Sequence, residues 1–376
     1  LQIGVLMKVN VPYINLPMQW KAEREFLLPI IEDVMSSGDF IGGARVEGFE
    51  DSVSALCETD FCVALNSGTD ALVTGLVAMG IGRGDEVITP PNSFVASTAA
   101  ISHIGAVPVF VDVVSDQSID ASKIEAAITK KTKAIMPVHL TGRMAQMDTI
   151  MEIADHFKIG VIEDSAQSIG SKFNTKSSGS IGQVGCFSTH PLKNLNACGD
   201  GGFLITNNRD IADRVRSLRN HGLLDRNTVK EFGYVSRMDA LQASILTYRL
   251  NKLESVTSKR QHNASLYDEL LDREYCFTPE PDSKIFNTYH TYVIQVSNRD
   301  GLQRYLTERG IETAIHYPIP IHLQPAAKNL GYKLGDFPVT ESQAGKILTL
   351  PIHQFLKESD IEAVASTVNK FFREAK

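Results

Sequence analysis

The sequence predicts an α/β fold in which helices cover both faces of a mostly parallel sheet. Short apolar runs alternate with helical patterns from residue 61 to residue 162, and strands joined in this way form parallel sheets with right-handed crossovers. The chain has 376 residues, which is enough for two domains. Its apolar fraction of 43% and charged fraction of 22% are typical of a globular protein and argue against disorder or a membrane span.

The first part of the chain is a helical lead-in to this alternation. Apolar residues such as Phe26, Leu27 and Ile30 recur at helical spacing and predict a helix over residues 20–35. The glycine pair Gly42–Gly43 follows and predicts a loop in which the backbone can approach a neighbour closely.

The remaining strands and helices are predicted from the spacing of their apolar residues. Each strand is a short apolar run, and each helix has apolar residues three and four positions apart. Strands are predicted at residues 62–65, 86–89, 107–111, 134–138, 160–162, 184–187, 203–206 and 292–296. Helices are predicted at residues 70–79, 95–104, 122–128, 147–157, 211–219, 238–253, 261–271 and 302–309.

The sequence pattern changes beyond Asp272, because the predicted strands and helices become shorter. The stretch Pro279-Glu280-Pro281-Asp282 and a later loop rich in proline and histidine separate them. We therefore predict a large domain over residues 11–254, including the lead-in, and a smaller C-terminal α+β domain over residues 255–376. Neither internal repeats nor low-complexity tracts are visible.

Charge and cysteine usage exclude several classes of protein. The net charge is -7 and no run of basic residues stands out, which argues against a nucleic-acid binder. The five cysteines are odd in number and irregularly spaced, so they indicate neither a disulfide framework nor a metal site. A reducing, cytoplasmic compartment is expected. The apolar patch at residues 3–7 is too short for a secretory signal, and Met7 is a candidate natural start.

The most informative stretch is the loop predicted between the strands at 184–187 and 203–206, which contains Lys193. Most lysines are solvated surface charges. Lys193 differs because it lies in a non-repetitive segment between two apolar runs, with Ser188 five residues before it. A lysine amine that is desolvated and close to other positive charge becomes a nucleophile, so Lys193 is a candidate covalent cofactor anchor.

Three turns that follow predicted strands supply matching chemistry. The turn Asn66-Ser67-Gly68-Thr69 opens a helix whose first N–H groups can hold a phosphate, although a plain N-cap is an alternative. Asp164 follows a buried strand and can keep a pyridine nitrogen protonated, or it can cap the next turn. Phe94 follows another strand and offers a ring for stacking, although a core phenylalanine is the commoner case. Ligands of such sheets bind beyond the carboxyl ends of strands, so the combination predicts a pyridoxal phosphate site.

These residues resemble those of the DegT/DnrJ/EryC1/StrS family of sugar aminotransferases. The resemblance covers nearly the whole chain. It is carried by residues 40–43, 66–72, 84–90, 161–167, 191–195, 199–202, 236–243, 316–320 and 350–353. It implies a pyridoxal phosphate enzyme of the aspartate-aminotransferase fold (fold type I), working as a homodimer with each active site at the interface.

The resemblance also implies roles for individual residues. Lys193 and Asp164 are the expected catalytic residues, as the covalent anchor of the cofactor and the partner of its ring nitrogen. The expected cofactor-binding residues are Gly68, Thr69 and Ser188 at the phosphate, Phe94 on the ring and Gln167 beside the ring hydroxyl. The expected contacts to a nucleotide-linked sugar come from Arg237, His316 and Tyr317, some of them from the neighbouring subunit.

One position departs from the family pattern. The family commonly has Gly-Tyr-Asn where this chain has Gly233-Tyr234-Val235, and valine cannot donate a side-chain hydrogen bond. A phosphate contact across the subunit interface is therefore in question here.

The expected activity is transfer of an amino group from an amino acid, with glutamate as the expected donor, to a 3-keto sugar on dTDP or UDP, for the synthesis of amino sugars and glycans such as a lipopolysaccharide O-antigen. Pro191 to Leu195 followed by Gly199-Asp200-Gly201-Gly202 resembles members that aminate carbon 3. The alternatives are an enzyme for carbon 4 or for cyclitols on the same scaffold, and a non-enzymatic regulator that keeps the cofactor pocket. A related dehydratase usually carries histidine in place of lysine, and Lys193 argues against that activity.

Overall fold

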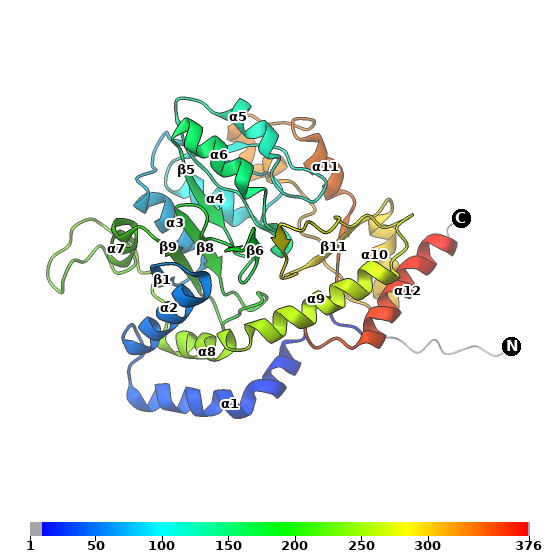
Figure 1. Cartoon of the computed structure of the whole chain (residues 1–376), viewed down its shortest axis with the longest axis horizontal. Helices are drawn as coiled ribbons and strands as arrows, with labels where there is room; N and C mark the ends of the chain where they lie inside the picture. The colour runs from blue at the N-terminus through cyan, green and yellow to red at the C-terminus, as the bar shows by residue number, and fades with distance from the viewer. Residues whose placement is uncertain (1–9, 375–376) are drawn as a thin grey trace.

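The computed structural model describes residues 10–374 and shows a seven-stranded sheet between helices (Figure 1). Two smaller sheets, of three and two strands, accompany it within these residues. The predictions about the apolar patch at residues 3–7 and about Met7 lie outside the described residues. Within residues 10–374, helices long and apolar enough to cross a membrane are not found.

The large sheet has the strand order β1-β9-β8-β5-β4-β2-β3. Neighbouring strands run parallel from β8 to β3, while β9 runs antiparallel to both β1 and β8. The strands of this sheet are β1 (Phe61–Leu65), β2 (Glu86–Thr89), β3 (Val107–Phe110), β4 (Thr132–Ile135), β5 (Gly160–Asp164), β8 (Val184–Ser188) and β9 (Gly202–Thr206). The prediction of a mostly parallel sheet is confirmed.

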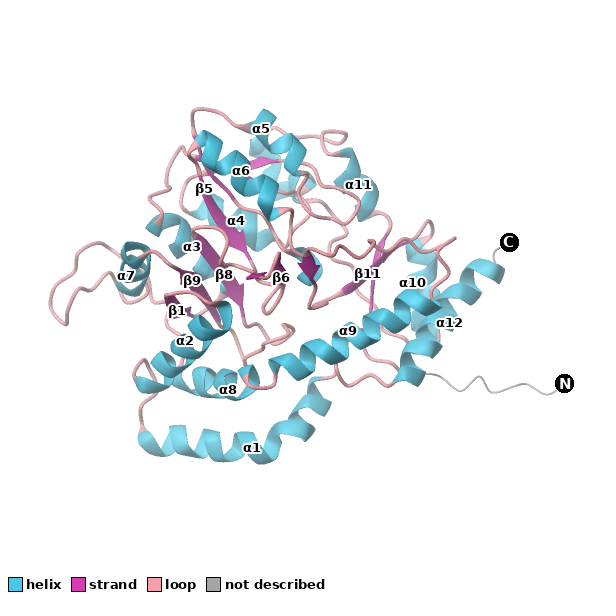
Figure 2. Ribbon diagram, viewed as in Figure 1, coloured by secondary structure: helices cyan, strands magenta, loops and turns pink. Residues whose placement is uncertain are grey.

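Helices cover both faces of this sheet (Figure 2). Alternate strand residues point to opposite faces, so Val63 and Leu65 pack in one core and Cys62 and Ala64 in another. The first core lies under α3 (Gly68–Ala78), α4 (Val95–His103) and α7 (Arg209–Leu218). The opposite face is covered by α2 (Ala44–Cys57), α8 (Ala240–Leu250), α5 (Ile124–Ala127) and α6 (Met147–Phe157). The long helix α1 (Leu16–Ser37) packs against α8.

The C-terminal part of the chain has its own core. The strands β11 (Tyr292–Gln295) and β12 (Ile347–Leu350) pair antiparallel. They pack with α10 (Arg299–Glu308) and α12 (Glu358–Glu374) around buried residues such as Leu302. The helix α9 (Leu253–Leu270) joins the two parts, because Leu253 packs in a core of the large sheet and Tyr267 in the C-terminal core. The predicted domain limits near residue 254 remain a prediction.

Several elements were not predicted. The helix α2 has apolar residues at helical spacing, namely Val46, Phe49, Val53 and Cys57, but the preceding glycine pair favoured a loop interpretation. The other elements are short, or lie beyond the loop rich in proline and histidine. They are β6 (Lys172–Phe173), β7 (Lys176–Ser177), β10 (Ile285–Phe286), α11 (Pro338–Ala344), β12 and α12. The strand β5 extends two residues beyond its predicted end, so Asp164 is its last residue.

Candidate active site

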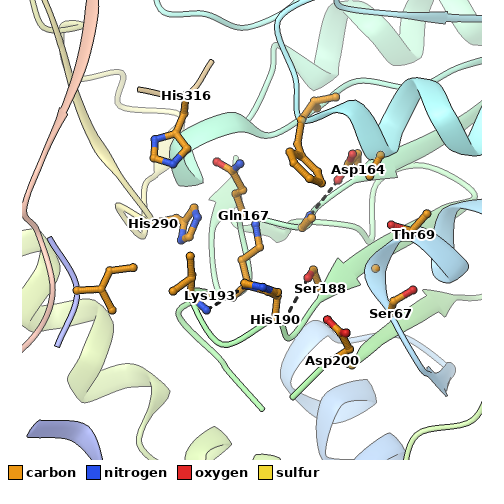
Figure 3. A pocket seen from close by; sticks show the side chains of 18 of the residues that line it. Ser67, Thr69, Asp164, Gln167, Ser188, His190, Lys193, Asp200, His290 and His316 are labelled. Carbon is orange, nitrogen blue, oxygen red and sulfur yellow. Dashed lines mark hydrogen bonds between the residues drawn. The ribbon is translucent and has the colours of Figure 1, made fainter. Parts of the chain in front are cut away.

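A cavity of about 350 Å³ lies beyond the carboxyl ends of β5 and β8, between the large sheet and the C-terminal part (Figure 3). This is where ligands bind in sheets of this type. All but one of the residues predicted for the site line it, namely Gly68, Thr69, Phe94, Asp164, Gln167, Ser188, Lys193, His316 and Tyr317. The exception is Arg237.

Lys193 lies in the loop from β8 to β9, and backbone hydrogen bonds fix that loop. The Lys193 N–H donates to the carbonyl of His190 at 2.8 Å, and the Ala197 N–H donates to the carbonyl of Thr189 at 2.7 Å. Hydrogen bonds within the protein therefore hold the conformation of this loop.

The environment of Lys193 changes its acidity. Burial lowers the pKa of its amine to about 8, and the negative charge of Asp164 acts in the opposite direction. The prediction that nearby positive charge would help to lower this pKa is therefore wrong. Desolvation of the amine is what lowers it. A larger fraction of the amine is unprotonated near neutral pH than for an exposed lysine.

The start of α3 and the end of β8 form a close-packed cradle. Ser67 caps the helix by accepting from the Asp70 N–H at 3.0 Å. A Cβ atom on Gly68 would lie 2.7 Å from the Cβ of Ser188, and one on Gly202 would lie 2.4 Å from the carbonyl carbon of Ser67. Only glycine allows this approach, and it leaves the first N–H groups of α3 beside the Ser188 hydroxyl, a donor set suited to a phosphate.

Asp164 and its neighbour Glu163 have different roles. One Asp164 oxygen accepts from the Ser97 hydroxyl at 2.7 Å and the other from the Ala166 N–H at 3.1 Å, so the carboxylate is fixed at the cavity wall. Glu163 is fully buried, pairs with His139 at 2.8 Å, and accepts from the N–H groups of three residues between 179 and 182. Of the two carboxylates at this strand end, Asp164 faces the cavity and Glu163 supports the backbone behind it.

Aromatic and polar side chains form the outer wall. The Phe94 ring is 54% exposed and lies 5.6 Å from the Tyr317 ring between centroids. The Gln167 carbonyl oxygen accepts from the Thr141 N–H at 2.8 Å, which directs the amide nitrogen toward the Tyr317 hydroxyl at 3.5 Å. His316 shares a hydrogen bond of 2.9 Å with Thr349. Burial, aided by the charge of Lys193, lowers the pKa of His316 to about 4, so this ring is neutral at pH 7.

Comparison with known proteins agrees with this geometry. The sequence profile of the DegT/DnrJ/EryC1/StrS aminotransferase family matches residues 21–369. The chain belongs to this family. The predicted family, fold class and enzyme class are thereby confirmed.

Two curated relatives of this aminotransferase show the range of the family. One, from Geobacillus stearothermophilus, is named a pleiotropic regulatory protein. It is 39% identical over 97% of this chain and 99% of its own length. Another, from Streptomyces venezuelae, is named dTDP-3-amino-3,4,6-trideoxy-alpha-D-glucose transaminase. It is 37% identical over 96% of both chains.

Solved structures resemble the aminotransferase over nearly its whole length. DesV from S. venezuelae, crystallised with a ketimine intermediate, has a TM-score of 0.94 and 37% identity over 96% of this chain and 98% of its own. The Bacillus subtilis protein ntda, crystallised with the cofactor PMP, has a TM-score of 0.87 and 32% identity over 96% of this chain and 85% of its own.

The structure places Arg237 of the aminotransferase away from this cavity. Arg237 lines a separate depression with Arg216 and Arg219, and donates to the side-chain oxygen of Asn220 at 3.1 Å. The nearby Val235 is 57% exposed and forms an isolated bridge with Asn220. Neither Arg237 nor Val235 lines the cavity that contains Lys193.

Several cavity residues of the aminotransferase were not predicted, namely Tyr13, His190, Asp200, Arg260, His290 and His353. His190 and Asp200 flank the predicted lysine and could have been found from that position. His353 ends the motif at residues 350–353 and could have been found from that motif. Tyr13, Arg260 and His290 lie on the N-terminal segment, α9 and the C-terminal part, in no motif used for the prediction. All five cysteines are free, and residues 10–374 contain no cluster of three or more His, Cys, Asp or Glu suited to a metal.

Proposed function

We propose that the protein is a pyridoxal phosphate-dependent aminotransferase that moves an amino group from glutamate to a 3-keto sugar carried on dTDP or UDP. The observation that carries this proposal is the convergence of Lys193, Asp164 and the Gly68–Ser188 cradle on one cavity. Relatives named as 3-amino-sugar transaminases and a structural relative that holds PMP support it.

The residues of the cavity fit the cofactor. The N–H groups at the start of α3 and the Ser188 hydroxyl would hold the phosphate, and Asp164 would hold the protonated ring nitrogen. Phe94 would cover one face of the ring, and Gln167 would lie beside its hydroxyl. When bound, pyridoxal phosphate supplies an electron sink that stabilises negative charge on the carbon bonded to the amino nitrogen.

The chain's own residues then account for the proton movements. The Lys193 amine has a pKa of about 8. It would accept the proton that leaves the α-carbon of the amino-acid donor, and it would return a proton to the carbon on the other side of the amino nitrogen. The Asp164 carboxylate faces the cavity, and two hydrogen-bond donors fix its orientation there. The neutral His316 and the Tyr317 hydroxyl can orient sugar hydroxyls without adding charge.

The second subunit is part of this proposal. The connection between α7 and α8 projects from the molecule (Figure 1) and carries exposed apolar side chains, namely Leu224, Val229, Phe232, Tyr234 and Val235. Such a cluster is typical of an interface. A homodimer would cover this surface and would allow Arg237 to reach the sugar bound by the other subunit. A reducing cytoplasmic compartment remains our expectation from the cysteine pattern.

Half-reactions test the activity. The purified protein loaded with cofactor should exchange nitrogen between ¹⁵N-glutamate and 2-oxoglutarate, and glutamate should bleach the visible absorbance of the bound cofactor. Lys193→Ala should abolish both, while Lys172→Ala, a lysine outside the cavity, should leave them intact. Normal turnover by Lys193→Ala would refute the assignment of the lysine.

Product analysis tests the sugar position. Incubation with 3-keto and 4-keto nucleotide sugars should give amination at carbon 3, and amination at carbon 4 alone would favour the alternative. The name of the Geobacillus relative gives a reason to test for a regulator. Failure of the cofactor-loaded protein to exchange nitrogen would favour that second function.

A further inference from the structure

Arg260 is a buried cation at the wall of the cavity that contains Lys193. It lies on α9, is 7% exposed, and lines both this cavity and a smaller one beneath the lysine loop. Its Nη1 atom donates to the backbone carbonyls of Tyr289 at 3.2 Å and His290 at 3.0 Å. Its Nε atom finds no hydrogen-bond acceptor among the described residues.

Arg260 also lacks an acidic partner. Among residues 10–374, buried arginines such as Arg249 and Arg299 form ion pairs with carboxylates, but Arg260 forms none within 4 Å. A buried charge without a counter-charge costs several kcal/mol. Two hydrogen bonds to neutral carbonyls offset only part of that cost, at roughly 1.5–3 kcal/mol each for a charged group.

The side chains around Arg260 do not supply the missing negative charge. Burial lowers the pKa of His353 and of His316 to about 4 and holds that of His290 well below its usual range, so all three rings are neutral at pH 7. Burial raises the pKa of Tyr13, so this hydroxyl is also neutral. Within residues 10–374, Arg260 thus has no ion-pair partner, and these four neighbours carry no negative charge.

The position of Arg260 suits a molecule that also reaches Lys193. His290 lies close enough to both cations that each of them lowers its pKa. Figure 3 shows His290 and His316 on the side of the cavity opposite to Ser67 and Thr69. An anion at Arg260 would thus lie on the far side of Lys193 from the proposed phosphate cradle, and it would be a different group from the cofactor phosphate.

We propose that Arg260 binds a carboxylate of the amino-acid donor and so holds the donor's amino group at Lys193. This inference rests on the proposed aminotransferase function. A guanidinium suits a carboxylate better than an ammonium does because it is planar and always charged. When the donor leaves as a keto acid, the carboxylate leaves with it, and the site is free for an uncharged part of the sugar.

Substitution of Arg260 tests this role. In Arg260→Gln the side chain keeps a polar amide but is shorter and has lost its charge. The concentration of glutamate that half-bleaches the cofactor should rise roughly 10- to 100-fold, as expected for loss of one charged hydrogen bond. The KM for the keto sugar should change less than threefold, and Arg260→Lys should recover part of the loss. Arg299→Gln, which removes a buried arginine outside the cavity, is the matched control.

A second readout does not depend on turnover. α-Methylglutamate has no hydrogen to lose at its α-carbon, so its binding to the cofactor-loaded protein can be measured by titration calorimetry. Its Kd should rise by the same factor in Arg260→Gln and not in Arg299→Gln. If Arg260→Gln does not fold, a crystal structure of the wild-type protein with this analogue decides, since a carboxylate oxygen should lie within hydrogen-bond distance of Arg260.

The outcomes separate this inference from the proposed function. A wild-type protein that does not react with glutamate would refute the function itself. A wild-type protein that reacts, with unchanged glutamate affinity in Arg260→Gln or with a loss confined to the keto sugar, would overturn only the role of Arg260. A crystal structure with the analogue's carboxylates elsewhere would overturn it as well.

Discussion

At the scale of single residues, the proposed catalysis depends on the charge of Asp164. The Asp164→Asn side chain can still bond to Ser97 and Ala166, because a hydroxyl can accept as well as donate. The fold should be kept while the charge is lost. We expect kcat for the glutamate half-reaction to fall on the order of 10²-fold or more, with little change in Tm. The control Ser97→Ala removes one hydrogen bond to the carboxylate but keeps the negative charge. It should lower the rate measured by stopped flow less than tenfold.

The acidity of Lys193 gives a second prediction. Because burial lowers its pKa to about 8, the unprotonated fraction of the amine rises about tenfold between pH 7 and pH 9 and then levels off. The rate at which the cofactor-free protein captures pyridoxal phosphate, followed by absorbance, should show the same profile. A rate that continues to rise tenfold per pH unit beyond pH 9 would contradict the lowered pKa.

Asp164 supplies the control for that profile. Its negative charge stabilises the protonated amine and opposes the effect of burial. In Asp164→Asn the midpoint should therefore move to lower pH, and a shift to higher pH would show that another group controls Lys193.

At the scale of elements, the lysine loop is joined to α1 by a pair of buried amides. Gln19 and Asn196 each donate to the other's oxygen at 3.0 Å, across 177 residues of sequence. Asn196 also donates to the carbonyl of Pro191, and Arg249 bonds both the Asn196 carbonyl and Glu23. The position of the loop thus depends on a helix that is remote in sequence.

This pairing predicts coupled effects on stability. Asn196→Ala leaves the buried Gln19 oxygen without its donor, although the Gln19 nitrogen still donates to Glu23. It should lower the free energy of unfolding by roughly 1–3 kcal/mol. Gln19→Ala should cost a similar amount, and the double variant should cost less than the sum by about 1 kcal/mol. Denaturant unfolding measures all three values. Strict additivity would show that the two amides act independently.

At the scale of the whole molecule, the connection between α7 and α8 carries two strongly exposed apolar side chains. Phe232 is 99% exposed and Leu224 is 61% exposed, both between α7 and α8. If the proposed dimer forms through this connection, the double variant Leu224→Asp/Phe232→Asp should sediment as a monomer in analytical ultracentrifugation, since burying two carboxylates in an apolar interface is costly. It should also weaken the contribution of Arg237 to sugar binding.

The control for the dimer prediction is Leu334→Asp, which changes a side chain that is 73% exposed just before α11, a helix on the other side of the molecule from this connection (Figure 1). It should leave the sedimentation coefficient unchanged. A wild-type protein that sediments as a monomer would contradict the dimer proposal.

The sequence by itself determined the strands of the large sheet, most of the helices that cover it and the turns that follow its strands. The spacing of apolar residues in a strand or helix is a local feature of the sequence, so the strand ends that carry Lys193, Asp164 and the Gly68 turn were recognisable. Parallel strands bring their carboxyl ends to one edge of the sheet, which predicts that these residues lie together. The helix α2 escaped prediction because Gly42–Gly43 obscured a helical spacing that was present.

Only the tertiary structure decided which distant groups join those turns. Arg260, His290 and Tyr13 come to the cavity because α9, the C-terminal core and the N-terminal segment meet there, and no local pattern encodes such a meeting. The lowered pKa of Lys193 likewise follows from burial by surrounding elements. Burial and long-range contacts depend on how whole elements pack, and this is why Arg260 became visible as an unpaired charge only in the folded chain.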